Sequence, residues 1–403
     1  MKPLDITIDQ LDPSQRDAVE LACSARVGII TGGPGTGKST CLRFALDWLD
    51  DHGISYELAA PTGKASKRIN ETTGRPARTI HRLLEWRGVF RRNHLNPIDT
   101  EVVIVDESSM IDVELGAALL SAIDPYVTRL ILIGDADQLP PVGPGRLFGD
   151  AVQSACFPTV RLSTLHRSAL ESWIHVNAPR VLRGESLDLG EHRDFAFVPV
   201  ERSADLLGEV RRVATELRGH RGIDSQVLIP QRTGVAGTLA ANAEMQAVFN
   251  PRTDDDAPYI RRDGYELRVG DRVIHTRNDY TLGVFNGECG DIVSIDGGRV
   301  AVQLDGREVV TYSWDQALAL QLAYALTVHR AQGSEFDWAI VLAHSTHTHM
   351  LSRQLLYTAI TRGKQGVVLI GDAKGIRAAL SDARTPKRNT TLIERLAKTL
   401  EAA

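Results

Sequence analysis

The residues from Gly32 to Ser39, GGPGTGKS, constrain this chain more than any other segment. They match the pattern G-x-x-x-x-G-K-[ST] and lie between an apolar run, Val27 to Thr31, and a run with helical spacing, Thr40 to Asp50. A strand, a glycine-rich loop and a helix in this order surround phosphate oxygens with backbone N–H groups and the positive end of the helix. The segment predicts an α/β fold that binds a nucleoside triphosphate.

Each residue type in this loop has an expected role. Lys38 would reach the β and γ phosphates, and Ser39 would offer its hydroxyl to Mg²⁺. The residues expected to complete the nucleotide site are Gly33, Pro34, Gly35, Thr36, Gly37 and Thr40. We therefore expect ATP and Mg²⁺ as cofactors.

A second apolar segment, Val102 to Val105, is followed directly by Asp106 and Glu107. In doubly wound sheets the carboxyl ends of buried parallel strands carry the chemistry. One of these two carboxylates could hold Mg²⁺, usually through water, while the other could polarise the water that attacks the γ phosphate. The alternative is a strand followed by a solvated acidic turn. Beside a phosphate-binding loop, two adjacent carboxylates favour hydrolysis over phosphoryl transfer to a metabolite.

Polar residues after one further strand and after a helical run could complete such a site. The strand Thr128 to Gly134 leads to Gln138, an amide that could sense the γ phosphate or could face solvent. The sequence LIGDA occurs at 132–136 and again at 369–373, which suggests two sheet domains of one design. In the later half, Arg362 follows a helical run, and it is a candidate arginine finger together with Arg167. For either arginine, a surface position is the alternative.

Composition narrows the class of protein. The chain has 403 residues and a formal net charge of −5, which argues against a protein that coats polyanions but leaves room for a basic groove. The four cysteines lie far apart, so we expect reduced thiols in a cytosol: Cys23, Cys41, Cys156 and Cys289. The sequence has no apolar run of membrane length and no basic n-region with an apolar core, so we expect a soluble, cytoplasmic protein without a membrane partner.

The order of the motifs resembles the superfamily 1 DNA helicases, in particular their RecD-like and Dda-like branch. Besides the loop and the acidic pair, the likeness is carried by LDPSQRDAV at 11–19, APTGKA at 60–65, ARTIHRLL at 77–84, IGDADQLPPVGPG at 133–145, VLIPQRTG at 227–234, AYALTVHRAQGSEFD at 323–337 and LLYTAITRGK at 355–364. The resemblance extends from about Leu11 to Asp372. It implies two RecA-like lobes, each a parallel sheet flanked by helices, at residues 1–155 and 156–403.

Two insertions are expected within these lobes. The basic and aromatic stretch at about 85–98 fits a two-stranded hairpin, the position at which the family carries its duplex-splitting pin. An ordinary surface hairpin is the alternative. The stretch 264–314 alternates β-branched and polar residues between glycine turns, which predicts a small antiparallel barrel. It resembles the SH3-like domain of RecD relatives, with a purely structural barrel as the alternative.

Carried over residue by residue, the resemblance assigns roles to further positions. Gln15 would read adenine, Asp106 would coordinate the metal, and Glu107 would activate water. The residues that would contact or sense the γ phosphate and ribose are Gln138, Arg167, Gly333, Glu335 and Arg362. The residues placed along the DNA track are Thr62, Lys64, His81 and His329, with Trp86 or Phe90 stacking on the last base pair at the pin. The segment Thr164-Leu-His-Arg167-Ser168 departs from the family pattern in its His and Ser, which weakens the assignment of Arg167.

These observations predict an ATP-dependent DNA helicase that moves on single-stranded DNA and separates duplex DNA, with ATP hydrolysed between the two lobes. The RecD-like resemblance implies movement from 5′ to 3′. Its partners would be single-stranded and forked DNA, with room for accessory DNA-processing proteins. We expect a monomeric, minimal motor without a long N-terminal extension. Two alternatives stay open: an ATP-gated single-strand clamp or remodeller that does not unwind, and an RNA-directed motor. No local pattern specifies the pathway, whether repair, replication, conjugation or a virus.

Overall fold

The computed structural model describes residues 8–164, 172–190, 192–220, 224–252, 254, 256–262, 264–279, 281–305, 308–382, 388 and 390–401. The chain divides into two compact units. Unit 1 comprises Met1–Glu171 together with Pro386–Ala403, and unit 2 comprises Ser172–Thr385.

Unit 1 is built on a six-stranded parallel sheet. Its strands are β1 (Val27–Gly32), β2 (Tyr56–Ala60), β3 (Ala77–Thr79), β4 (Val102–Val105), β5 (Arg129–Gly134) and β6 (Thr159–Leu162), in the spatial order β3-β2-β4-β5-β1-β6. Because β4, β5 and β1 are parallel neighbours, the segments that follow them meet at one edge of the sheet.

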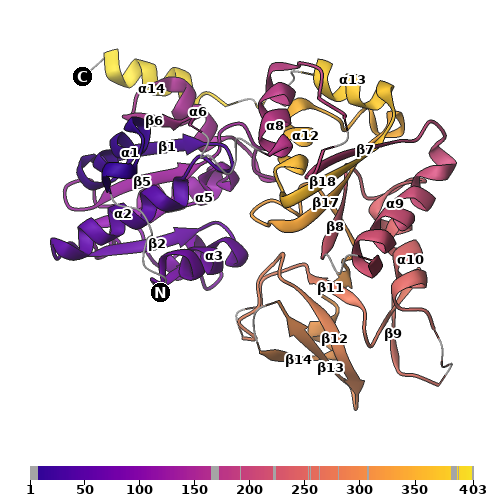
Figure 1. The fold of residues 1–403 in the computed structure, drawn as a ribbon. Helices are drawn as coiled ribbons and strands as arrows, with labels where there is room; N and C mark the ends of the chain where they lie inside the picture. Colours follow the sequence, from indigo (N-terminus) through magenta and orange to yellow (C-terminus); the bar gives the residue numbers. More distant parts are fainter. Residues whose placement is uncertain are drawn as a thin grey trace. The chain divides into compact units, whose positions relative to one another are not determined.

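Helices cover both faces of this sheet (Figure 1). They are η1 (Ile8–Gln10), α1 (Pro13–Ser24), α2 (Lys38–Asp51), α3 (Gly63–Thr73), α4 (Ile80–Leu83), η2 (Ser108–Met110), α5 (Val113–Ser121), α6 (Leu147–Ser154) and α14 (Leu392–Glu401). Successive strand residues point to opposite faces, so Ile30 packs in one core cluster with Leu46 while Ile29 packs in the other with Phe148. Burial on both faces explains why the strands read as continuous apolar runs.

The division of the chain differs from the expected boundary after residue 155. Strand β6 lies beyond that boundary and pairs with β1, and the C-terminal helix α14 packs against α6 of unit 1. The local sequence of β6 does not specify the sheet that it joins, and that of α14 does not specify the helix against which it packs.

Unit 2 contains a five-stranded parallel sheet of the same design. Its strands are β7 (Phe195–Pro199), β8 (Ser225–Ile229), β16 (Ala325–Thr327), β17 (Phe336–Ala343) and β18 (Gly363–Gly371), in the order β16-β8-β17-β18-β7. Its helices are α8 (Trp173–Arg183), η3 (Ser203–Asp205), α9 (Leu206–Thr215), η4 (Glu216–His220), α10 (Thr238–Phe249), η5 (Ser345–His347), α12 (Arg353–Ile360) and α13 (Ala373–Ser381). The prediction of two parallel sheets flanked by helices is confirmed.

A small antiparallel unit is inserted between β8 and β16, and Figure 1 shows it set apart from the parallel sheet. It consists of β9 (Tyr259–Arg262), β10 (Tyr265–Arg268), β11 (Arg272–His275), β12 (Cys289–Asp296), β13 (Arg299–Leu304), β14 (Val309–Ser313), α11 (Trp314–Ala317) and β15 (Leu320–Leu322). Strands β9 and β10 form a hairpin, and the others form a sheet in the order β14-β13-β12-β11-β15. The insertion therefore extends past the expected end at residue 314, because β15 pairs with β11.

The expected two-stranded hairpin at 85–98 was wrong. The structure describes all of these residues, and they form a compact loop with an isolated antiparallel bridge between Asn93 and Asn96. The N–H groups of Arg91 and Arg92 both donate to the carbonyl of Leu84, at 3.1 and 3.3 Å. Two consecutive donors directed at one acceptor cannot take part in a strand ladder, since donors along a strand alternate in direction.

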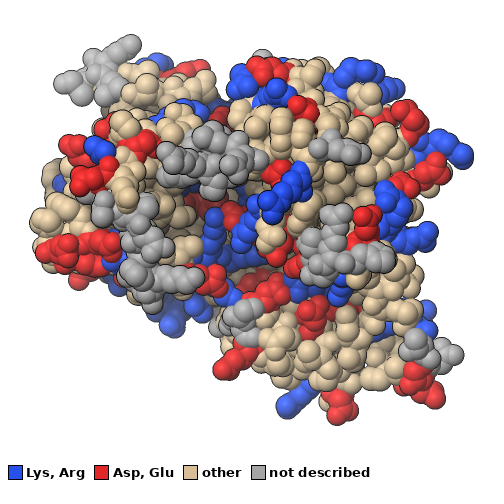
Figure 2. Space-filling model, in the orientation of Figure 1, with Lys and Arg blue, Asp and Glu red and all other residues tan. Residues whose placement is uncertain are grey.

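The thiols, the surface charges and the helices can be compared with the expectations from composition. All four cysteines are free thiols, and burial raises the pKa of Cys23 to about 11 and that of Cys41 to about 12. Acidic and basic side chains are interspersed over the face shown in Figure 2. Among the described helices, none combines the length and the hydrophobicity needed to cross a membrane.

Candidate nucleotide and nucleic-acid sites

The loop between β1 and α2 has the backbone geometry of a phosphate site. Gly37 precedes α2 with φ +90°, a left-handed conformation that side chains disfavour, and the helix start has no side-chain cap. The ammonium group of Lys38 donates to the carbonyl oxygens of Gly32 (2.5 Å) and Gly33 (2.9 Å). The loop thus curls around its own lysine, with the uncapped N–H groups of α2 available to an anion.

Gln15 lies directly beneath this loop and is fully buried. Its side-chain amide donates to the carbonyl of Thr36 at 3.1 Å, while its Oε1 accepts from the backbone N–H of Asp12 at 3.2 Å. The carboxylate of Asp12 accepts in return from the Gln15 N–H at 3.1 Å, which completes a capping box at the start of α1. Gln15 therefore supports the phosphate loop, and its reading of adenine stays a prediction.

The two predicted carboxylates stand at the end of β4. Glu107 has φ +53°, and its N–H donates to the Asp106 carboxylate at 2.8 Å. Burial and the charge of Glu107 raise the pKa of Asp106, against a lowering by Lys38 and Arg68. A cation would relieve this repulsion, and the oxygen donors of Asp106 and Ser39 are of the kind that Mg²⁺ prefers, so the residues present fit the predicted metal.

Arg68 is a site residue that sequence reasoning missed. It lies on α3, and its Nη1 is 4.0 Å from Oε1 of Glu107, whose side chain is 13% exposed. The pair can therefore orient the carboxylate expected to activate water. The available signal was spacing, since Arg68 follows Lys64 by one helical turn in the motif APTGKASKR.

Gln138 is buried after β5, so the alternative of a solvent-facing glutamine does not hold. Its Nε2 donates to the buried carboxylate of Asp135 at 3.1 Å, but its Oε1 accepts no hydrogen bond from any described residue. A buried amide oxygen without a donor costs about 1–3 kcal/mol. The arrangement suits an oxygen that accepts a hydrogen bond from a water, because the phosphate oxygens of a nucleotide are themselves acceptors.

Three of the predicted DNA contacts form one aromatic cluster. The rings of Trp86 and Phe90 lie 4.5 Å apart between centroids, and His81 lies 5.8 Å from Phe90. Burial lowers the pKa of His81, so its ring is neutral at pH 7. Trp86 is 37% exposed.

Thr62, another predicted DNA contact, caps α3. Its side-chain oxygen accepts from the N–H of Ala65 at 3.2 Å, which directs the hydroxyl into the helix start.

Unit 2 gathers Arg362, Gly333 and Glu335 at one edge of its sheet. Arg362 is 2% exposed, and its guanidinium donates to the carbonyls of Thr358 (3.1 Å) and Ser334 (3.0 Å), which excludes a surface position. Gly333 has φ +69° just before Ser334.

The remaining unit 2 candidates lie close by in the chain. Glu335 forms an ion pair with Lys364 at 3.8 Å. His329 lies in the turn between β16 and β17, and Arg167 lies outside the described residues.

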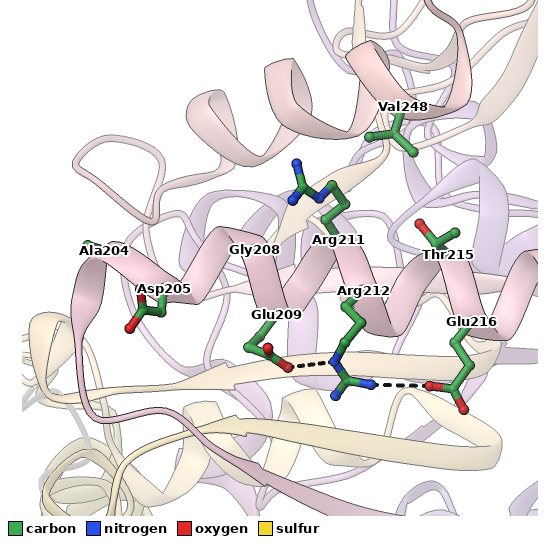
Figure 3. A pocket seen from close by; sticks show the side chains of 9 residues that line it. All are labelled: Ala204, Asp205, Gly208, Glu209, Arg211, Arg212, Thr215, Glu216 and Val248. Carbon is green, nitrogen blue, oxygen red and sulfur yellow. Dashed lines mark hydrogen bonds and ion pairs between the residues drawn. The ribbon is translucent and has the colours of Figure 1, made fainter.

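An open hollow of about 1140 Å³ lies elsewhere in unit 2, along α9, with Val248 of α10 on its rim (Figure 3). Along α9, Arg212 forms ion pairs with Glu209 (2.8 Å) and Glu216 (3.3 Å). The other charged lining residues, Asp205 and Arg211, pair with Arg202 and Glu244. None of the predicted site residues lines the hollow.

Comparisons with known proteins place these features in a family. Residues 15–144 match the AAA domain family, residues 241–305 match the SH3 domain of ATP-dependent RecD-like DNA helicases, and residues 322–370 match the UvrD-like helicase C-terminal domain. The RecBCD enzyme subunit RecD of Mycolicibacterium smegmatis is 33% identical over 95% of this chain and 74% of its own length. The chain belongs to the RecD-like family of superfamily 1 helicases. The family predicted from the motifs is therefore confirmed, as is the SH3-like nature of the inserted sheet.

The chain is also similar to a longer helicase and to a solved helicase structure of lower sequence identity. The ATP-dependent RecD2 DNA helicase of Deinococcus radiodurans is 40% identical over 96% of this chain, which spans about half (52%) of that relative. A crystal structure of a Bacteroides Pif1 helicase with ADP-AlF3 and single-stranded DNA covers 97% of both chains at a TM-score of 0.60 and 19% identity, which shows a shared fold.

Proposed function

We propose that this RecD-like chain is the motor of an ATP-dependent DNA helicase, which moves 5′ to 3′ on single-stranded DNA and separates the duplex ahead of it. One observation carries the proposal. Three neighbouring parallel strands are followed by Lys38, by the pair Asp106–Glu107 and by Gln138, whose amide oxygen has no hydrogen-bond donor among the described residues. The same chain also holds the RecD-like SH3 insertion.

ATP hydrolysis would use these residues in distinct roles. The N–H groups of the loop and the ammonium of Lys38 bind and orient the phosphates, exchanging the loop carbonyls for phosphate oxygens. Mg²⁺, held by Ser39 and Asp106, would supply charge neutralisation at the phosphates. Glu107, oriented by Arg68, accepts the proton of the attacking water. Gln138 positions the γ phosphate or that water.

Unit 2 would complete the reaction and report it. In this proposal the guanidinium of Arg362 stabilises charge on the γ phosphate, so that ATP binding and release change the conformation of the chain. Alternating grip on phosphate groups would then move the strand, with binding independent of sequence and sensitive to salt. Lys64, His329 and the cluster of His81, Trp86 and Phe90 are the proposed contacts, with exposed Trp86 as the ring that meets the base pair.

Several finer assignments belong to the same proposal. The direction of movement follows from the RecD-like resemblance. We propose a monomeric, cytoplasmic motor. Relatives named as subunits of the RecBCD enzyme make accessory DNA-processing proteins the partners to test.

The test is strand displacement from two otherwise identical duplexes, one with a 5′ single-stranded tail and one with a 3′ tail. ATP and Mg²⁺ are present, and Lys38→Ala protein is the control. We expect unwinding of the 5′-tailed duplex alone, lost in Lys38→Ala, because that variant lacks the phosphate-binding ammonium.

Other outcomes separate the alternatives. Opening of the 3′-tailed duplex alone would overturn the direction and keep the helicase. DNA-stimulated ATP hydrolysis without unwinding would favour a clamp or remodeller. A duplex with an RNA tail, opened in preference to DNA, would favour an RNA-directed motor.

A further inference from the structure

The C-terminal segment contacts the loop that follows Gln138. Arg388 donates through Nη1 to the carbonyl oxygens of Gly143 and Gly145, the latter at 2.8 Å, and through Nη2 to the carbonyl oxygen of Pro141. Three backbone acceptors from one loop thus converge on one guanidinium, which is a fork of donors suited to several oxygens at once.

The loop in question, 139–146 (LPPVGPGR), is buried at its first three residues, whereas its middle is exposed. Three of its residues are prolines, which have no N–H to donate. The carbonyl of Pro144 accepts from the N–H of Val113 at 2.9 Å, whereas those of Pro141, Gly143 and Gly145 are the acceptors of Arg388. The side chain of Val142 is 80% exposed, so packing does not fix the middle of the loop. Arg388 thus bonds three carbonyl oxygens in the later part of the loop, beside the bond that Val113 makes.

The same segment is anchored beside this loop by α14. Helix α14 packs against α6, which begins at Leu147, directly after the loop, with Leu392, Ile393 and Leu396 partly buried. The packing of α14 against α6 keeps the Arg388 guanidinium beside the loop. Arg146 repels this guanidinium, and the carboxylate of Asp112 attracts it.

We propose that Arg388 is a positioning residue for ATP hydrolysis: by holding the 139–146 loop it fixes Gln138, which immediately precedes that loop, in the geometry needed at the γ phosphate. The inference rests on the proposed function, because it assigns Gln138 to ATP turnover. Arg388 itself would touch neither nucleotide nor DNA. It acts through the backbone of the loop.

The first test measures the loop alone and needs no activity. A nitroxide spin label is attached at Val142→Cys, in a background with Cys23→Ser and Cys156→Ser, and its mobility is read by electron paramagnetic resonance. We expect faster motion of the label when Arg388→Ala is added. The matched control is Arg395→Ala, which removes the same charge from an exposed position of α14; it should leave the spectrum unchanged.

The second test separates positioning from binding, without the label or its background changes. For Arg388→Ala we expect kcat of DNA-stimulated ATP hydrolysis to fall about tenfold, while the Kd of a fluorescent nucleotide changes by less than about twofold. Arg388→Lys should recover part of kcat, because an ammonium can bond some of the three carbonyls. Arg395→Ala should behave as wild type.

Three results would overturn the proposal: equal label mobility in Arg388→Ala and Arg395→Ala, an unchanged kcat, or a fall in kcat matched by equal losses of nucleotide affinity and melting temperature. The last would indicate a general role in stability. A wild-type protein without any DNA-stimulated hydrolysis would instead overturn the proposed function, and the label would still report whether Arg388 holds the loop.

Discussion

At the scale of single residues, the candidate site contains backbone strain at its centre. Glu107 has φ +53°, a conformation that costs a residue with a side chain about 1–3 kcal/mol. The N–H of Glu107 bonds the Asp106 carboxylate, and Arg68 lies 4.0 Å from the Glu107 carboxylate. Both interactions depend on that backbone turn. The strain is therefore tied to the placement of two carboxylates in different roles.

The role of Glu107 predicts a specific separation of binding from chemistry. In Glu107→Gln the amide keeps the shape of the side chain but cannot accept a proton, so we expect kcat for ATP hydrolysis to fall by at least about 100-fold. Nucleotide affinity should stay near that of wild type, since Lys38 and the loop are intact. The measurement is steady-state hydrolysis beside nucleotide titration. The control Glu101→Gln makes the same change at the opposite end of β4, and equal losses in both variants would contradict the assignment.

A buried histidine in unit 2 predicts a dependence of stability on pH. Burial lowers the pKa of His347 from 6.5 to about 4. The backbone of Ala236 opposes this shift, and the charges of His344 and His349 add to it. The unfolded chain therefore binds the proton more readily than the folded one. The stabilisation from neutral His347 is present above pH 6.5 and is lost as the pH falls towards 4, by about 2 kcal/mol at pH 5.

The measurement is urea unfolding at pH 7.5 and pH 5. In His347→Gln the difference in unfolding free energy between the two pH values should be smaller than in wild type by about 2 kcal/mol. His349→Gln, at an exposed position two residues away, should retain the wild-type difference. An equal pH dependence in wild type and His347→Gln would show that other groups are responsible.

At the scale of elements, long apolar runs next to glycine signals were predictable and short segments were not. The strand, loop and helix around Lys38 follow from period and turn chemistry, which act within a few residues. The loop at 85–98 depends on Leu84, whose carbonyl takes two N–H groups from the far arm. Strands β6 and β15 each have at most four residues and owe their places to distant partners. Local sequence does not specify such partners.

The candidate site shows the same division between local and distant information. Lys38, Asp106 and Glu107 are each marked by their own motif. Other features exist only once the chain is folded: the buried, unbonded Oε1 of Gln138, the ion pair of Arg68 and the three acceptors of Arg388. The sequence predicted which polar residues stand at the ends of strands, and the structure adds the residues that contact them.

The SH3-like insertion is attached to unit 2 by a buried polar network that sequence reasoning missed. Asp271 is fully buried, and its carboxylate accepts from Gln246 (2.6 Å), Asn250 (2.8 Å), Tyr324 (3.0 Å) and the N–H of Arg268 (2.7 Å). Burial and the charge of Asp271 raise the pKa of Tyr324, which therefore keeps its proton as the donor. One carboxylate thus joins α10, the turn before β11 and the chain before β16.

Removing this carboxylate should weaken the attachment of the insertion to the rest of unit 2. We expect Asp271→Ala to lower the free energy of unfolding by about 3 kcal/mol, because several buried donors lose their acceptor together. Urea unfolding followed by tryptophan fluorescence provides the measurement. Asp296→Ala, at the exposed last residue of β12, should change stability by less than about 0.5 kcal/mol. Comparable losses in the two variants would refute the role of the network.

At the scale of the whole molecule, two sheets of one design use the same local sequence differently. The strand end Gly134-Asp135 in unit 1 leads to Gln138, whose amide Asp135 holds. The equivalent Gly371-Asp372 in unit 2 begins a helix instead, where Asp372 caps α13 through the N–H of Gly375 at 2.6 Å. The repeated sequence therefore predicts the shared fold of the two units, while the residues after each strand decide which unit carries the chemistry.

Arg362 tests whether unit 2 takes part in that chemistry. Its Nε and Nη1 bond backbone carbonyls, and Nη2 makes a longer contact of 3.4 Å with the Thr361 hydroxyl. A guanidinium held by one side can direct its remaining donors at a phosphate, whereas a lysine has no second fork. In Arg362→Lys we therefore expect kcat for ATP hydrolysis to fall by about 10³, with nucleotide affinity close to wild type because the phosphate loop belongs to unit 1.

The control for this prediction is Arg377→Ala, which removes an exposed arginine from α13 of the same unit. Both proteins are compared with wild type in DNA-stimulated hydrolysis, in nucleotide titration and in thermal unfolding. A loss confined to kcat in Arg362→Lys would mean that a buried residue of unit 2 acts on the nucleotide of unit 1. A different outcome is turnover near the wild-type rate with only the melting temperature reduced. Arg362 would then be a support for the turn at Ser334, and any part of unit 2 in ATP hydrolysis would have to rest on other residues.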